Sequence, residues 1–223
     1  PLCGQVKNFV TLRGGFFMSG NSRELSIYKT PFSARYWKDA AGELKNVRIL
    51  AIVALFIAIR IAMQGLVLPV GENLRIYFTF LVNALGVMIY GPVAGLVSGF
   101  AVDILGFFIV PTGGAFFPGY TLSTMLGSFF YAIFLYRSRI SVVRIILSKV
   151  CVNILVNVGL GALWSAILYS KGYYYYLVKS LIKNLTLLPI EIILLVLFLQ
   201  LMIPIAARFN LIPRQPTARI PFK

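Results

Sequence analysis

The sequence has no histidine and only two cysteines among its 223 residues. The missing histidine removes the commonest general base near neutral pH and the commonest metal ligand. Cys3 and Cys151 are too far apart for a zinc-binding motif, and one lies in a polar segment while the other lies in an apolar one. We therefore expect two free thiols, no metal site and no histidine-based chemistry.

A phosphate-binding loop is also absent. No glycine in the chain is followed by lysine, which excludes the P-loop pattern G-x-x-x-x-G-K-[ST]. The sequence therefore predicts that this chain is not an enzyme and does not hydrolyse ATP by that route.

The composition is strongly apolar and strongly basic. Apolar residues make up 59% of the chain, charged residues only 12%, and 21 Lys and Arg face 6 Asp and Glu for a net charge of +15. Soluble domains are nearer half apolar and a quarter charged. A basic balance often indicates nucleic-acid binding, but such a protein would not be this apolar. We predict an integral membrane protein with the lipid bilayer, and no nucleic acid, as partner.

Six apolar runs are long enough to cross a bilayer as helices, which takes roughly 17–25 residues. The runs are continuous, whereas barrel strands would alternate. Gly91-Pro92 separates the second run from the third because this pair breaks a helix and starts another. We predict an all-α membrane protein, a six-transmembrane-helix bundle over residues 47–68, 74–90, 92–110, 119–136, 145–169 and 177–203.

The basic residues alternate between the two sides of the predicted bundle. Twelve lie before or at the start of the first run, between runs four and five, or after run six, whereas two lie in the opposite loops. The positive-inside rule then places both termini in the cytoplasm. The twelve are Lys29, Arg35, Lys38, Lys45, Arg48, Arg137, Arg139, Arg144, Arg208, Arg214, Arg219 and Lys223, and the two are Arg75 and Lys171.

The chain divides into a membrane domain and two polar tails. We expect an N-terminal polar and basic tail at 1–45, a six-helix substrate-binding domain at 46–205, and a basic cytoplasmic C-terminal tail at 206–223. Residues 1–17 precede the first methionine, Met18, and are interpreted as upstream sequence. Residues 19–46 fit a cytoplasmic segment with an interfacial helix on anionic lipid.

Polar side chains inside the runs gather toward the outer leaflet. Ionisable residues are costly there and usually mark a site or a buried ion pair. Helix direction places Arg60, Arg75, Asp103, Thr121, Lys183 and Asn184 in the outer part, with Glu191 nearer the midplane. Arg60 and Asp103 fit either a binding site or an ion pair with each other. The convergence predicts a small-molecule cavity.

The fifth run carries Asn153, Asn157 and Trp164 on one helix face. We interpret Asn153 as a helix–helix hydrogen-bonding residue. Asn157 and Trp164 fit packing and ligand binding equally well. The tyrosines at 173–176 are typical of an interfacial aromatic belt, with a lid over the cavity as the alternative.

Ala54, Ala58 and Ala62 form a stripe of small residues along the first run. Such a stripe allows another helix to approach closely. It indicates either a docking face for a partner subunit or packing inside the bundle. Gly91, Gly95 and Gly99 have the same spacing in the third run and are interpreted as internal packing.

Four segments occur in an order that resembles a known family. They are Glu-Asn-Leu-Arg-Ile-Tyr-Phe-Thr-Phe-Leu at 72–81, Tyr-Gly-Pro-Val-Ala-Gly at 90–95, Asp-Ile-Leu-Gly-Phe at 103–107 and Gly-Ala-Phe-Phe-Pro-Gly-Tyr-Thr-Leu-Ser at 114–123. Together they resemble the folate-specific substrate-binding subunit, or S component, of energy-coupling factor vitamin transporters. The resemblance covers about residues 45–205, and the last segment is the most specific.

The resemblance implies a high-affinity folate-binding subunit in the bacterial cytoplasmic membrane, with its site near the extracellular side. It also implies partners: a membrane coupling subunit and two ATPase subunits that supply the energy of import. In this family, small-residue motifs of the first helix dock on the coupling subunit, which suggests that role for Ala54, Ala58 and Ala62. The S component is thought to topple in the membrane to deliver its ligand.

Folate offers chemistry that the polar residues can match. Asp103 or Asn157 would bind the donors of the pterin ring, and Phe117, Tyr120 or Trp164 would flank its flat face. Arg60, Arg75 or Lys183 would neutralise the glutamate tail. Thr121 completes the set of candidate ligand-binding residues.

Three alternatives remain at the level of sequence. The first is an S component for another vitamin, such as riboflavin, thiamine or a pantothenate-like compound. The second is an intramembrane enzyme, but Asp103 and Glu191 are each alone in their runs and no histidine is present. The third is an envelope-assembly scaffold, which would not need polar groups at the outer leaflet.

Overall fold

The computed structural model describes residues 28, 33–69, 75–110, 116–169, 172–213 and 220–221. The predictions for Cys3, residues 1–17 and several basic loop residues lie outside these ranges. Those basic residues are Lys29, Lys171, Arg214, Arg219 and Lys223.

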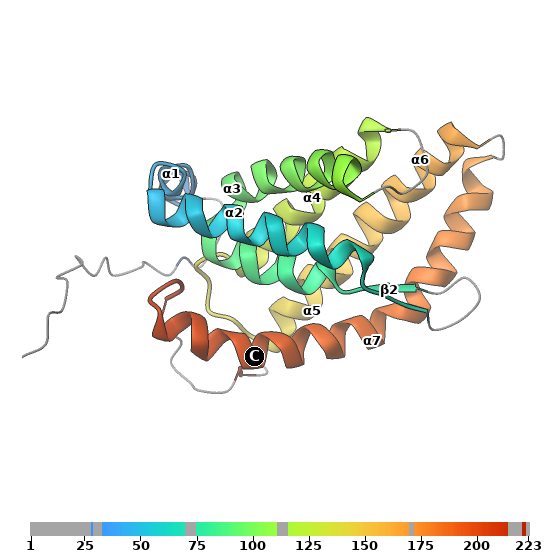
Figure 1. Cartoon of the computed structure of the whole chain (residues 1–223). Helices are drawn as coiled ribbons and strands as arrows, with labels where there is room; N and C mark the ends of the chain where they lie inside the picture. Colours follow the sequence, from blue (N-terminus) through green and yellow to red (C-terminus); the bar gives the residue numbers. More distant parts are fainter. Residues whose placement is uncertain are drawn as a thin grey trace, which may run out of the picture.

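The fold is a helical bundle with one short β-hairpin at the end where α2 finishes (Figure 1). The elements are α1 (Ala34–Glu43), α2 (Val47–Ala62), the 3-10 turn η1 (Met63–Gly65), β1 (Val67–Pro69), β2 (Arg75–Tyr77), α3 (Thr79–Ile109), α4 (Pro118–Leu135), α5 (Val142–Cys151), the π-helical η2 (Val152–Leu160), α6 (Gly161–Leu168) and α7 (Tyr173–Arg208). The predicted all-α class is confirmed apart from the hairpin.

A sharp reversal at Gly91 divides α3 into two antiparallel halves (Figure 1). Gly91 has a φ of 84°, a left-handed conformation that costs glycine little, and Pro92 follows it. Across the bend, Tyr90 and Ser98 share a hydrogen bond of 3.2 Å, although eight positions would separate them by two turns in a straight helix. The predicted boundary between the second and third segments is therefore confirmed.

Six helical segments make up the bundle: α2, the two halves of α3, α4, the continuous rod of α5, η2 and α6, and α7. Within the described residues, four helical stretches are long and apolar enough to cross a membrane: Val47–Gly65, Thr79–Ile109, Val142–Leu168 and Tyr173–Arg208. The 31-residue α3 counts once among these four because its two halves are joined at the bend.

Two of the predicted helices are shorter than the apolar runs suggested. The expectation of helix at 66–68 and at 75–78 is wrong, because Val67–Pro69 and Arg75–Tyr77 pair as antiparallel strands. Leu68 faces Ile76 and Pro69 faces Arg75 in this pairing. Hydropathy reports only that these residues are apolar, whereas the hairpin lets their backbone groups satisfy one another.

The π-helical segment η2 interrupts the rod that the fifth run forms. A π-helix has more residues per turn than an α-helix and is frequent at functional sites. The carbonyl oxygen of Asn157 in η2 accepts a hydrogen bond from the Ser180 hydroxyl of α7 at 3.1 Å. The sequence periodicity did not predict this change of helix type.

The α1 helix is attached to the bundle by packing and by charge. Tyr36 and Ala40 are buried, and the ring of Tyr36 packs edge-on against Tyr136 at 5.4 Å. Burial raises the pKa of Tyr36. The Arg137 guanidinium bridges Asp39 at 2.9 Å and Glu43 at 2.6 Å. The expected helix in the N-terminal region is thus present, and it packs on the end of the bundle where α2 begins.

Candidate ligand-binding site

Two adjoining cavities lie among α3, α4, η2 and α7. The larger has a volume of about 500 Å³ and the smaller a volume of about 220 Å³. Ser123, Val156 and Asn157 line both, so these three residues stand where the cavities meet. Ligand cavities for drug-sized molecules are typically about 300–1,000 Å³.

Three cations line the larger cavity. Arg75 comes from β2, while Lys179 and Lys183 lie one turn apart on α7 and so share a face. None of the three is joined to a carboxylate by an ion pair among the described residues. The arrangement favours a ligand with carboxylate groups.

Aromatic rings form a wall of the same cavity. Trp164 and Tyr120 line it directly, and the ring of Phe117 lies 5.6 Å from each of theirs. The indole nitrogen of Trp164 also donates a hydrogen bond to the Ser123 hydroxyl at 2.8 Å. Tyr176, the last residue of the tyrosine run, joins the lining from the first turns of α7. A flat aromatic ligand would fit such a wall.

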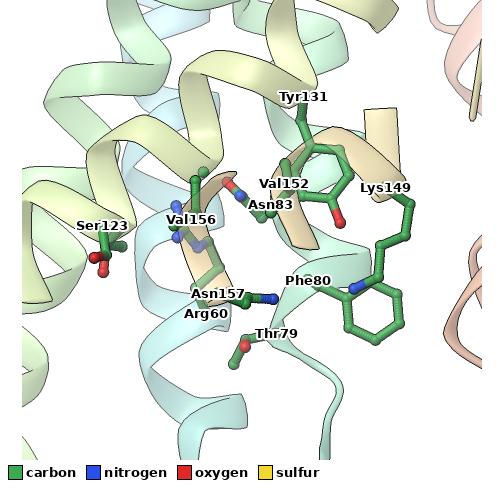
Figure 2. A pocket seen from close by; sticks show the side chains of 12 residues that line it. Arg60, Thr79, Phe80, Asn83, Ser123, Tyr131, Lys149, Val152, Val156 and Asn157 are labelled. Atoms are coloured by element: carbon green, nitrogen blue, oxygen red, sulfur yellow. The ribbon is translucent and has the colours of Figure 1, made fainter. Parts of the chain in front are cut away.

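The smaller cavity, drawn in Figure 2, contains hydrogen-bond donors that have no partner among the described residues. Arg60 is only 4% exposed, and its Nε and Nη1 atoms are buried without a hydrogen bond. The Tyr131 hydroxyl is likewise buried and unpartnered. Buried donors without partners are costly, so this cavity is suited to a ligand group that accepts hydrogen bonds.

An ion pair with little exposure lies between the two cavities' linings, with Lys149 in the smaller and Glu191 in the larger. The Lys149 amino group lies 3.0 Å from Glu191 and 3.9 Å above the centre of the Phe80 ring. Glu191 also accepts from the Asn153 amide at 3.5 Å, and the Asn157 amide donates to Asn153 at 2.6 Å. The interpretation of Asn153 as a residue that bridges helices agrees with its contact to α7.

Asp103 lies apart from Arg60. Its carboxylate accepts hydrogen bonds from Thr121 at 2.6 Å and Thr124 at 3.4 Å, and joins the second half of α3 to α4. The suggested ion pair between Arg60 and Asp103 is not among the three ion pairs of the described residues. The two helices hold these side chains at different positions, which hydropathy cannot distinguish.

The structure brings together most of the candidate residues but not all of them. Arg75, Tyr120, Asn157, Trp164 and Lys183 line the larger cavity, and Arg60 lines the smaller one. Phe117 supports the aromatic wall from behind. Asp103 and Thr121 are absent from both linings and bind each other instead.

Sequence reasoning missed several lining residues. Lys149 is 2% exposed, and its position inside an apolar run was a signal for it. Lys179 precedes Lys183 by one helical turn, which was a second signal. Asn83 and Tyr131 sit in segments where nothing in the local pattern separates a lining residue from a packing residue. Within the described ranges, no group of three or more His, Cys, Asp or Glu could hold a metal ion.

The fold and the site together define a multi-pass helical membrane protein with a cavity large enough for a small ligand. No family model matches the chain. It is 32% identical over 150 residues to the folate transporter FolT of Clostridium novyi (strain NT), which covers 67% of this chain and 87% of the relative. On this similarity, the chain belongs to the FolT family of folate transporters.

Two further comparisons agree. The folate transporter FolT of Leuconostoc mesenteroides subsp. mesenteroides is 25% identical over 154 residues, 66% of this chain and 82% of the relative. A crystal structure of FolT bound with folic acid matches with a TM-score of 0.59 and 29% identity, over 67% of this chain and 91% of the other. The recognition of the family from sequence motifs is confirmed.

Proposed function

We propose that this chain is the folate-binding S component of an energy-coupling factor importer. It captures folate at the extracellular side and delivers it inward together with a separate coupling subunit and two ATPases. The observation that carries the proposal is the pair of adjoining cavities: among the described residues, one has an aromatic wall and cations without an ion pair, and the other has buried donors without a partner. Folate presents the complementary groups: carboxylates, a benzoyl ring and a pterin.

The larger cavity suits the glutamate end of folate. Arg75, Lys179 and Lys183 would bind its two carboxylates, because charge-assisted hydrogen bonds are the stronger ones and these cations form no ion pair among the described residues. Trp164 and Tyr120 would pack against the benzoyl ring. In this assignment Arg60 is not part of the carboxylate clamp, since it lines the other cavity.

The smaller cavity suits the pterin. Its ring carbonyl and ring nitrogens would accept from Arg60 and from the Tyr131 hydroxyl. Asn157, at the junction of the cavities, would bind a ring donor. In this assignment Asp103 and Thr121 do not contact the ligand; their hydrogen bond holds α3 against α4 beside the aromatic wall.

The surface of α2 supports the proposed partnership. Ala54, Ala58 and Ala62 are all exposed on the isolated chain, so the small-residue stripe is not consumed by packing inside the bundle. A coupling subunit in the same bacterial cytoplasmic membrane would dock there, with both termini of this chain in the cytoplasm. ATP would be hydrolysed by the two ATPase subunits.

A binding titration on the purified chain tests the function. Folate is expected to bind tightly and riboflavin weakly, because riboflavin lacks carboxylates for the three cations. A ligand-stripped protein that bound riboflavin but not folate would make it an S component for another vitamin. Copurification of two ATPases with the tagged chain from its native membrane tests the importer assignment.

A further inference from the structure

A chain of polar contacts leads from a buried ion pair to the junction of the two cavities. It runs from Lys149 through Glu191 and Asn153 to Asn157, with distances of 3.0, 3.5 and 2.6 Å between successive groups. Lys149 is 2% exposed, and its charge keeps a carboxylate partner at Glu191. The ion pair therefore fixes which group donates and which accepts hydrogen bonds at this end of the series of contacts.

The donor and acceptor roles set by the ion pair also fix the orientation of the Asn153 and Asn157 amides. An ionised carboxylate only accepts hydrogen bonds, so Asn153 must direct its NH2 group toward Glu191. The Asn153 carbonyl oxygen is then the group that faces Asn157, and Asn157 must donate its own NH2 to it. Without the carboxylate, either amide could turn over, because the oxygen and nitrogen ends of an amide are nearly equal in size.

The last group in this series of contacts, the side-chain carbonyl oxygen of Asn157, is a hydrogen-bond acceptor that lies open to a ligand. With its NH2 group donating to Asn153, the side-chain carbonyl oxygen of Asn157 is left over, and no described side chain donates to it. Asn157 lines both cavities. We propose that Lys149, Glu191 and Asn153 form a relay that sets the Asn157 amide as an acceptor, and so select ligands with an N–H donor at that point.

The relay is a determinant of ligand specificity within the site, and the assignment of its ligand rests on the function proposed above. Folate carries a ring N–H beside its ring carbonyl. In 4-amino folate analogues the corresponding ring nitrogen has a lone pair in place of the hydrogen. A fixed acceptor at Asn157 attracts the first pattern and repels the second, which makes Lys149, Glu191 and Asn153 positioning residues for this discrimination.

The sharpest test uses Asn153→Leu, because Asn153, unlike Lys149 and Glu191, lines neither cavity. The measured quantity is the ratio of the dissociation constants of a 4-amino folate analogue and of folate. We expect the variant to reduce this ratio about tenfold, as expected when one oriented hydrogen bond is lost. Glu191→Gln is expected to reduce it similarly, since a Gln amide can donate as well as accept.

Two controls separate orientation from general damage. Ser148→Ala removes a buried hydroxyl that bonds only the Ile145 carbonyl among the described residues, and Glu43→Gln alters a carboxylate paired with Arg137 at the other end of the bundle. Both are expected to keep the ratio. Equal weakening of folate and analogue by Asn153→Leu would overturn the relay, and so would an unchanged ratio.

A measurement on the ligand-free protein tests the relay whichever vitamin the protein binds. In protein labelled with 15N at asparagine, the side-chain NH2 signal of Asn157 is assigned by its loss in Asn157→Asp. Its hydrogen exchange is expected to be about tenfold faster in Asn153→Leu than in the unchanged chain, since its acceptor has gone. Unchanged exchange would overturn the proposal. If the chain bound riboflavin and not folate, the proposed function would fail while this measurement still judged the relay.

Discussion

Trp164 and Ser123 are joined by a hydrogen bond of 2.8 Å from the indole nitrogen to the hydroxyl oxygen. This bond links α6 to α4 at the larger cavity, where both residues are part of the lining. The second tryptophan, Trp37, lies on α1 and stacks on Phe129 with ring centres 6.0 Å apart. The two indoles therefore report on different parts of the molecule.

Folate binding is expected to quench the fluorescence of Trp164 and not that of Trp37. In Trp164→Phe the quenching should disappear, whereas in Trp37→Phe it should be retained, because α1 contributes no residue to either cavity. The measurement is a fluorescence titration of each single-tryptophan variant. Quenching that survived in Trp164→Phe would move the ligand away from the aromatic wall.

The double variant Arg75→Ala with Lys183→Ala should weaken folate binding about tenfold or more, since each cation is expected to hold a carboxylate through charge-assisted bonds. 6-Hydroxymethylpterin, which carries no carboxylate, should bind the variant and the unchanged chain alike. The exposed Lys38 of α1 supplies the control Lys38→Ala. Equal losses for folate and 6-hydroxymethylpterin would rule out a carboxylate clamp.

Gly91→Ala should destabilise the bundle. A side-chain carbon at Gly91 would lie 2.9 Å from the Tyr136 ring, and its φ of 84° is unfavourable for alanine. We expect a loss of about 2–3 kcal/mol in the free energy of unfolding. The matched control Gly42→Ala in α1 has open space around the new carbon and should be neutral or slightly stabilising. Thermal unfolding in detergent measures both.

Arg137→Ala should release α1 from the bundle. The substitution leaves Asp39 and Glu43 without their cation, and Glu43 is buried. We expect a loss of about 2 kcal/mol, with discounting for the partial exposure of Asp39. Limited proteolysis before α2 should become faster. The control variant Arg139→Ala, which changes an exposed neighbouring residue, should be cleaved at the same rate as the unchanged chain. Equal cleavage rates for the two variants would show that the packing of Tyr36 alone holds α1 on the bundle.

Ala58→Trp should separate binding from transport. The residue is exposed on α2 and belongs to neither cavity lining, so folate affinity of the purified chain should be unchanged. A bulky ring in the small-residue stripe would prevent close helix approach, and folate uptake should be lost. Ile193→Trp on the exposed side of α7 is the control and should leave uptake intact. Normal uptake in Ala58→Trp would assign docking to another face.

Much of the architecture could be read from local patterns. The apolar runs gave the six helical segments because a membrane helix satisfies its own backbone within one continuous stretch. Gly91-Pro92 marked the reversal of α3 because both residues act on their own backbone. The folate family followed from four short segments. The hairpin at Val67–Tyr77 could not be read this way, since strand pairing depends on a second segment.

The sequence predicted only some of the residues that line the two cavities. Arg75, Tyr120, Trp164 and Lys183 line the larger cavity, and the sequence had singled them out because polar or aromatic residues at the end of a span often line a site or anchor the helix at the interface. Hydropathy could not tell that Arg60 faces the smaller cavity with its Nε and Nη1 atoms unbonded among the described residues, while Asp103 binds Thr121. Depth along a helix is a one-dimensional quantity, whereas a contact also needs the rotation of both helices.

The sequence alone therefore determined the environment of this protein, its helical segments and its family, because these depend on composition and on short continuous patterns. Only the tertiary structure decided which polar groups pair and which remain free for a ligand. Lys149 and Glu191 are 42 positions apart and meet only because α5 packs on α7. That meeting orients the polar groups beside the cavities, and no pattern within either helix encodes it.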